Sequence, residues 1–477
     1  MKTSAWPPKL AQLVLLLGAA IVLGGCVHYQ PKPLDSAQTE SNLNSRTLVD
    51  AGLKAFIATN APELAQEWPR PAWELAGLTL AALYFHPSLD VARAQWQANQ
   101  ASVITARARP NPTISATPEY TVNPASGVSP WIATIQFDVP IETAGKRRHR
   151  IARAEQLTRA AYLQLASSAW KVRSEVRSSL VDWTVARRSV ELLQRQQEFQ
   201  SNVVAALEKR LAAGAVANSD VTLFRVTLSK TLVSVGETKA RTAAARVRLA
   251  QALGLPVSAL DGADVRFDLS APPVGAERFT SAEMRKEALH GRADVLAGLA
   301  EYAASEAALR LEIAQQYPDV HLSPGYQYDQ GENKWGLGLS VELPVLNQNQ
   351  GPIAEANARR AEAAARFTAL QARIIGELDA AESAYRAAQE QVVNTETFAA
   401  AQAAQYRAVE QQVKAGAADP IDALYAELEQ LAGQTAKLDA LARLQRAIGQ
   451  LEDAVQQPLD ATNQRPIDLS RNPRPNP

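Results

Sequence analysis

Large apolar residues recur at steps of three and four through two long stretches of the chain, which is the spacing of an α-helix. The clearer stretch runs from Ile353 to Val413 and contains no proline and a single glycine, Gly376. The other covers residues 146–211. At 1.5 Å per residue these helices would be roughly 90 to 100 Å long, whereas helices of globular proteins average about three turns. Such lengths indicate a shaft, a coiled coil or a duct.

Two shorter stretches alternate between apolar and polar residues, which is the pattern of a β-strand with one apolar face. In the first, the apolar positions are Trp131, Ala133, Ile135, Phe137, Val139 and Ile141. In the second, they are Trp335, Leu337, Leu339, Val341, Leu343 and Val345. The segment NPASGVSP before the first stretch favours a turn. The sequence therefore predicts one β-hairpin at 112–142 and another at 317–346.

The same order of elements occurs twice. The first repeat, 74–256, is predicted to hold a helix from about 73 to 109, the hairpin 112–142, the long helix 146–211 and a return helix 219–253. The second repeat, 281–455, is predicted to hold a helix 281–316, the hairpin 317–346, the long helix 353–413 and a return helix 420–455. Gly214 pairs with Gly416, and Asp220 with Asp422, each 202 positions apart. The equal offset predicts long helices of equal length.

Three segments lie outside the repeats. Residues 26–73 read as an extended N-terminal arm with a short helix near Leu48–Thr59. Residues 257–280 read as a linker or a small equatorial side structure. The tail 456–477 is polar and rich in proline, so it is expected to be disordered.

The expected fold class is mostly α with a membrane β-barrel. Two short helices laid end to end match one long helix, which favours a helical cylinder of about 100 Å. Strands of about 10 to 12 residues cross a bilayer when tilted. The two hairpins of one chain supply only four strands, and an open sheet edge cannot sit in lipid. A trimer would form a 12-stranded barrel on an α-helical barrel, although the edge of a soluble sandwich also alternates.

The N-terminus reads as an export signal over residues 1–25. Lys2 and Lys9 form a short basic region, and the apolar run Leu10–Leu23 is too short to span a membrane. The following LGGC ends at Cys26, the only cysteine of the chain. This resembles a bacterial lipoprotein signal, which implies lipidation of Cys26 and a lipid-anchored N-terminus. Val27, rather than an aspartate, implies the outer membrane as the destination. An ordinary signal peptide with an incidental cysteine is the alternative.

Composition narrows the function classes. The chain carries 49 Lys+Arg and 49 Asp+Glu, and a nucleic-acid-binding protein of this size would show a basic excess. One cysteine excludes an intrachain disulfide, and 5 His with 2 Met argue against a dedicated soft-metal site. The nucleophile, metal and phosphate-loop motifs HExxH, GxxxxGK[ST] and GxSxG are absent. We therefore expect no enzyme, no bound metal and no cofactor apart from the covalent lipid.

Several stretches resemble the TolC family of outer-membrane efflux ducts. FDVPIETAGKRRHRIARAE and VELPVLNQNQGPIAEANARRAEA are similar to that family's strand-to-helix junctions, and RLAAGAVANSDV and VKAGAADPIDAL to its helical tips. The resemblance implies a homotrimer that works as a passive duct with a periplasmic adaptor protein and an inner-membrane efflux pump. It implies export of metal cations or drugs, and the first junction looks more like the heavy-metal branch. A lipid-anchored periplasmic coiled-coil adaptor or scaffold is the second hypothesis.

The resemblance also points to residues near the second tip. In the family, two aspartates narrow the periplasmic end of the duct; Asp422 matches the first, and Tyr425 stands where the second would fall. Asp419 is a further candidate for this pore constriction. Rings of carboxylates favour cations. The alternative is helix capping, since an aspartate near a helix N-terminus interacts well with the helix dipole.

Two further groups of residues are candidates for contacts. By the same resemblance, Leu211, Gly214, Val413 and Gly416 at the two tips would dock the adaptor, although glycine at a helix end also serves simple turn chemistry. The basic run Lys146–Arg150 follows the first hairpin. It could face outer-membrane lipid headgroups or form a solvated helix start.

Overall fold

The computed structural model describes residues 28–270 and 281–459. The chain divides into two compact units, residues 1–46 and residues 47–477. In the first unit, α2 (Ser36–Asn44) begins at Asp35, whose carboxylate accepts a hydrogen bond from the backbone N–H of Ala37. The predicted signal segment and Cys26 lie outside the described residues.

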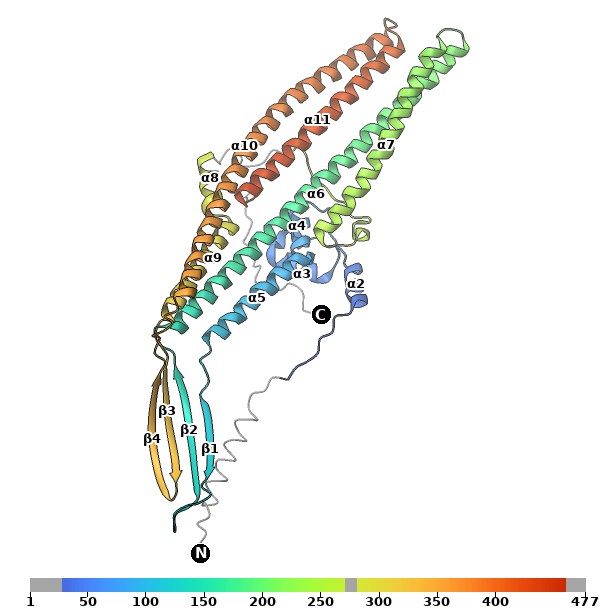
Figure 1. The fold of residues 1–477 in the computed structure, drawn as a ribbon. Helices are drawn as coiled ribbons and strands as arrows, with labels where there is room; N and C mark the ends of the chain where they lie inside the picture. Colours follow the sequence, from blue (N-terminus) through green and yellow to red (C-terminus); the bar gives the residue numbers. More distant parts are fainter. Residues whose placement is uncertain (1–27, 271–280, 460–477) are drawn as a thin grey trace. The chain divides into compact units, whose positions relative to one another are not determined.

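The second unit contains the two repeats, whose elements Figure 1 labels in chain order. The N-terminal elements are α3 (Ala51–Asn60), η1 (Pro62–Ala65), α4 (Leu75–Phe85) and α5 (Pro87–Arg107). They are followed by β1 (Thr113–Tyr120), β2 (Trp131–Ile141), α6 (Lys146–Ala212), α7 (Asn218–Leu253) and η2 (Val257–Leu260). The second repeat comprises α8 (Ser281–His290), α9 (Ala293–Ala314), β3 (Val320–Asp329), β4 (Glu332–Val341), α10 (Gln350–Lys414) and α11 (Pro420–Val455).

The four strands form one antiparallel sheet in the order β1-β2-β3-β4. The two hairpins predicted from alternation therefore join edge to edge within one chain. Figure 1 shows that the sheet lies beyond the ends of the helices, and no described helix covers either of its faces. Within the described residues, the outer edges of β1 and β4 pair with no further strand.

The two long helices nearly match in length. α6 has 67 residues and α10 has 65, so the predicted equality was wrong by two residues. Their N-caps, Gly145 and Asn349, are 204 positions apart, whereas their last residues, Ala212 and Lys414, are 202 apart. The difference thus arises at the sheet-proximal ends. Both N-caps have positive φ, 71° and 61°, and glycine and asparagine tolerate that conformation best.

Each predicted short helix before a hairpin is broken, which corrects the single helices expected at 73–109 and 281–316. α4 and α5 meet at a bend of 52°, because Pro87 cannot donate a helical hydrogen bond and instead occupies the first position of α5. His86 caps α5 by accepting from the N–H of Ser88. α8 and α9 separate at Gly291, a residue that disfavours a helix interior.

The largest apolar core surrounds α4, at the middle of α6. Leu53, Leu78, Leu89, Leu180 and Leu253 are fully buried there. The arm and the predicted linker also meet here, because the backbone of Trp73 donates to Asp264 and accepts from Arg266. The linker 257–280 is thus partly structured, while residues 271–280 lie outside the described part.

The start of the predicted tail is ordered as well. Leu459 is buried and its N–H donates to the Glu452 carboxylate at 3.0 Å. The Gln456 side chain accepts from the N–H of Ala293 at 3.0 Å. The disorder expected for 456–477 is therefore wrong for residues 456–459, which lock onto α11 and α9; the rest of the tail lies outside the described residues.

Candidate functional site

The two helical tips are built alike. The N–H of Ala215 donates to the Arg210 carbonyl at 2.9 Å, and the N–H of Ala417 donates to the Gln412 carbonyl at 2.8 Å. Gly214 and Gly416 each have φ of 72°, so both tips end in the left-handed glycine turn that closes many helices. A Cβ on either glycine would meet nothing within 4 Å. The glycines are thus needed for backbone conformation and leave an open surface at each tip.

The candidate constriction residues Asp419 and Asp422 form a reciprocal cap at the start of α11. The Asp419 carboxylate accepts from the N–H of Ile421 at 2.8 Å. The Asp422 carboxylate accepts from the N–H of Asp419 at 3.1 Å. Such a capping box satisfies backbone donors that the helix leaves unpaired. The capping role expected as the alternative is therefore present, and Asp422 remains solvent-exposed beside it.

Asp419 also binds across to the other tip. Arg210, in the last turn of α6, donates to both carboxylate oxygens at 3.1 Å each. The hydrogen bond from Arg210, followed by that from the Ile421 N–H, lowers the pKa of Asp419. Bidentate arginine–carboxylate pairs are among the stronger and more directional polar contacts. This pair joins residues 209 positions apart.

An apolar contact lies beside the ion pair. Val203, Leu207 and Val221 form a buried cluster, against which Leu211, Ile421 and Leu424 pack. Tyr425 stacks on Phe224 of α7 with ring centroids 5.7 Å apart, in a tilted arrangement. Tyr425 thus contacts the first tip and leaves about half of its surface exposed. Of the predicted docking residues, Leu211 and Val413 are half-buried and the two glycines are exposed.

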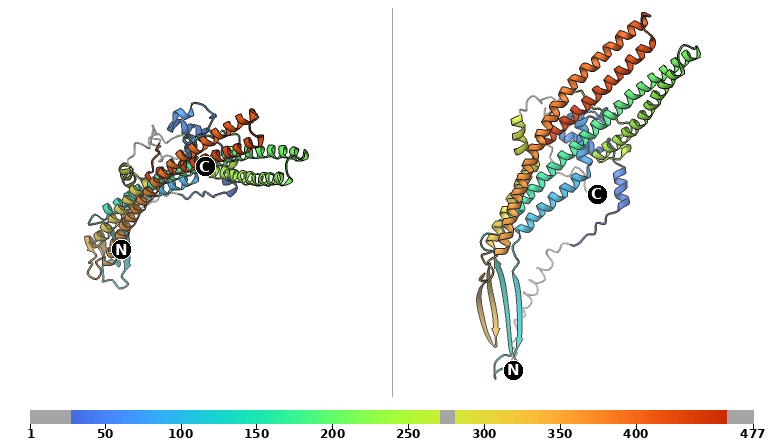
Figure 2. Two further views of the ribbon diagram at one scale, coloured as in Figure 1. Left: turned by 90° about the horizontal axis from the view of Figure 1, so that it is seen from above. Right: turned by 45° about the horizontal axis from the view of Figure 1, so that its top comes forward.

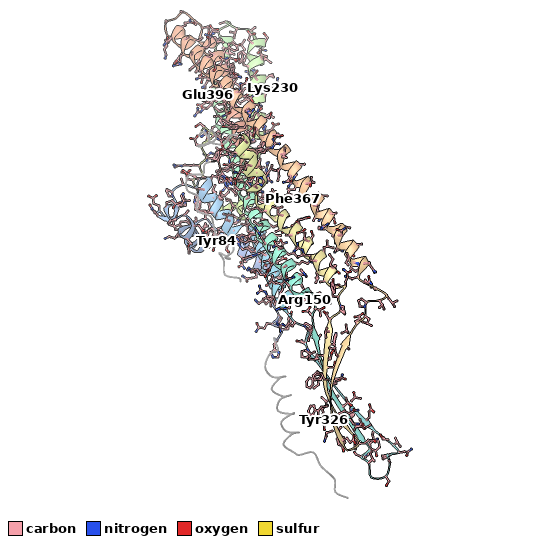
Figure 3. All side chains as sticks on the ribbon, turned by 90° about the vertical axis from the view of Figure 1, so that its left-hand side faces the viewer. Tyr84, Arg150, Lys230, Tyr326, Phe367 and Glu396 are labelled. Atoms are coloured by element: carbon pink, nitrogen blue, oxygen red, sulfur yellow. The ribbon has the colours of Figure 1, made fainter. Side chains whose placement is uncertain are left out.

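The basic run after the first hairpin is largely turned toward the protein. Lys146 pairs with Asp319 at 2.7 Å, and Arg150 pairs with Glu142 at 2.6 Å. Arg147 and Arg150 also donate to backbone carbonyls at the end of α5. Figure 3 places Arg150 where the helices meet the sheet. These cations therefore fasten the sheet to the helices, a role that the acidic residues Glu142 and Asp319 could have indicated from sequence.

A buried charged cluster joins α6 to α11 further along the helices. Arg177 donates to the carbonyl and side-chain oxygens of Gln445 at 2.6 and 3.1 Å. Glu452, 4% exposed, accepts from Arg173 at 2.8 Å and Arg177 at 3.2 Å. A Cβ on Gly449 would lie 2.7 Å from Arg177 Nη1, so glycine admits the guanidinium beneath α11. Sequence reasoning missed this cluster, because its residues lie more than 260 positions apart.

The sheet separates polar from apolar side chains onto two faces. The strand register puts Ile114, Ile135, Leu322, Leu339 and Val341 on one face and Ser115, Gln136, Ser323, Gly338 and Ser340 on the other. Two ring pairs lie on the apolar face, with ring centroids 5.0 Å apart in Tyr120–Trp131 and 4.9 Å apart in Tyr326–Trp335. The first pair ends the ladder of its hairpin, and the second lies three residue pairs before the end of its ladder; Figure 3 labels Tyr326. Exposed apolar strands that end in aromatic residues are typical of lipid-facing sheets.

Within the described residues, no single helix combines the length and hydrophobicity needed to cross a bilayer; only the bent pair α4 and α5 meets both criteria together. The same residues contain no cluster of three or more histidine, cysteine, aspartate or glutamate side chains that could hold a metal ion.

Comparison with known proteins identifies the arrangement. The family model described as outer membrane efflux protein matches residues 80–255 and 284–456. The chain is 27% identical over 294 residues to the cobalt-zinc-cadmium resistance protein CzcC of Cupriavidus metallidurans, over 61% of this chain and 68% of that protein.

Two solved structures share the fold. The outer membrane protein VceC from Vibrio cholerae superposes with a TM-score of 0.66 at 20% identity, over 81% of this chain and 96% of that one. The outer-membrane channel OprN superposes with a TM-score of 0.66 at 21% identity, over 92% and 99%. The predicted fold class and family are thereby confirmed. The chain belongs to the outer membrane efflux protein family, whose members are passive outer-membrane channels of efflux systems and not enzymes.

Proposed function

We propose that three copies of this chain form a duct that exports divalent transition-metal cations. The observation that supports the duct is the four-stranded sheet. Its apolar face is exposed, and its outer edges pair with no other strand in the described part of the chain. Open edges are not tolerated in lipid. Three copies would pair every edge and give twelve strands, within the range of outer-membrane barrels.

The proposed partners are a periplasmic adaptor protein and an inner-membrane efflux pump. The two open glycine turns at Gly214 and Gly416, with Leu211 and Val413 behind them, offer the adaptor a repeated contact on each copy. The pump supplies the energy, and the duct opens when its tips separate. A lipid on Cys26 anchors the N-terminus, and no other cofactor is proposed.

The proposal that the cargo is a metal cation is supported by the relative CzcC, whose name states resistance to cobalt, zinc and cadmium. The test is an export assay in cells that keep the pump and adaptor but lack this chain. Restoring the chain should lower the accumulation of Co²⁺, Zn²⁺ and Cd²⁺ and leave the accumulation of a hydrophobic dye unchanged. Restored dye export without metal export would instead assign the duct to drugs.

A Cys26→Ser variant separates the duct from the alternative of a tethered adaptor or scaffold. A duct is held in the outer membrane by its barrel, so the variant should stay in that membrane after a carbonate wash. A chain held by lipid alone would be released into the soluble fraction.

A further inference from the structure

One histidine lies on the polar face of the sheet. His321 of β3 and Asp138 of β2 are neighbours across the β2–β3 ladder, where His321 stands opposite Pro140. Its Nδ1 lies 3.1 and 3.0 Å from the two carboxylate oxygens of Asp138. Both side chains keep close to two-fifths of their surface exposed, at 39% and 38%. The pair is thus formed and also accessible from the polar side.

The geometry fixes which nitrogen of the ring can act. A carboxylate accepts only, so Nδ1 carries the proton that it donates to Asp138. The lone pair is then on Nε2, which forms no hydrogen bond or ion pair with the described residues. A histidine that donates one N–H to a carboxylate is the arrangement that orients histidine ligands in metal sites and raises their basicity.

The surroundings suit a cation. The hydroxyl of Ser323 donates to Asp138 at 3.4 Å, and Ser340 stands opposite His321 on β4. Asp319, two residues before His321, is balanced by Lys146. No described lysine or arginine forms an ion pair with Asp138.

We propose that Nε2 of His321, backed by Asp138, binds hydrated divalent transition-metal ions on the wall of the channel. Imidazole suits zinc, cobalt, nickel and copper. A single protein ligand, with water completing the coordination sphere, holds such an ion weakly. Weak binding is what a conducting site needs, because the ion has to leave as well as enter. The proposal rests on the proposed function, in which this face of the sheet lines the lumen.

The experiment is Zn²⁺ titration by calorimetry of the full chain, purified without a histidine tag in lipid nanodiscs. Wild-type protein should bind Zn²⁺ with low affinity at one site per chain, and Zn²⁺ should protect His321 from diethyl pyrocarbonate. His321→Ala should abolish this site. Asp138→Asn should weaken it by about 10- to 100-fold, the usual effect of losing an outer-shell partner. His290→Ala, a histidine change on α8, should leave it unchanged.

The outcome that overturns the proposal is Zn²⁺ binding that is absent from the wild type or identical in His321→Ala. Thermal melting and KCl conductance of each variant show whether it is folded and open. If the His321→Ala channel conducts KCl, exports metal normally and binds Zn²⁺ as the wild type does, that result refutes the His321 site and leaves the proposed function standing. If the wild-type chain does not restore metal export in the cellular assay, the proposed function itself is wrong.

Discussion

Arg210 and Asp419 join the end of α6 to the start of α11 through two hydrogen bonds of 3.1 Å. The pair links two hairpins that are otherwise held together at this end by the cluster around Leu207 and by the ring contact of Phe224 with Tyr425. Figure 2 shows the α6–α7 and α10–α11 hairpins extending side by side toward their tips. Any motion that parts these tips has to break this pair.

Replacing Arg210 by alanine should therefore favour the open duct. The Asp419 carboxylate would lose its partner on the other tip, while its cap on α11 would remain. We expect a several-fold rise in single-channel conductance in planar bilayers. Arg225→Ala is the matched control, because Arg225 pairs with Glu208 within the first hairpin only. Equal conductance of Arg210→Ala and Arg225→Ala would contradict a lock between the tips.

The same pair predicts how the gate responds to acid. Because the pKa of Asp419 is lowered in the folded chain, the contact contributes fully above the ordinary aspartate value of about 3.9. It is lost only as the pH falls through the lowered folded value. Conductance should therefore stay level from neutral pH down to roughly pH 4 and rise below it. Asp419→Asn should remove that acid-induced rise, and a rise already near pH 6 would refute the assignment.

The buried cluster between α6 and α11 predicts a stability effect. Arg177→Ala removes one of the two arginines that face the Glu452 carboxylate, together with the hydrogen bonds that Arg177 donates to the oxygens of Gln445. Removing one partner of a buried ion pair costs about 3 kcal/mol or more, so melting should occur at a clearly lower temperature. Arg446→Ala provides the control between the same helices, because its pair with Asp182 is exposed and contributes at most about 1 kcal/mol. A similar melting temperature for both variants would show that burial does not matter here.

A charged residue should be tolerated on the polar face of the sheet and should impair membrane insertion on the apolar face. Ile135→Arg places a cation on the apolar face, at a cost of about 2 to 4 kcal/mol if the residue lies near the bilayer midplane. Gln136→Arg places the same cation one residue further along the strand, on the polar face. We expect less outer-membrane channel for the first variant and normal amounts for the second, measured by fractionation and heat modifiability. Normal insertion of Ile135→Arg would argue against a lipid-facing side.

Sequence periodicity predicted the two repeats because each element is long and regular. Alternation over Trp131–Ile141 identified β2 without knowledge of its partner. In the second hairpin the alternation identified β4 only as far as Val341, and the expected strand positions Leu343 and Val345 lie beyond its end. The break at Pro87 could have been predicted, since proline removes a helical donor. By contrast, Arg210 and Asp419 are 209 positions apart, and the sequence around either residue contains no signal that the two side chains pair. The pairing of Arg177 with Gln445 and Glu452 depends likewise on how α11 packs against α6.

The outer edges of β1 and β4, which pair with no other strand among residues 28–270 and 281–459, make membrane insertion a shared event in the proposed trimer. A lone chain has no way to satisfy its edge backbone groups in lipid, so folding of the sheet and meeting of three copies become one step. The yield of finished channel then depends steeply on how many chains are present at once. A subunit with a defective β1 edge would also prevent the two normal copies in the same trimer from forming a closed barrel. Such an allele would therefore be dominant over the normal one.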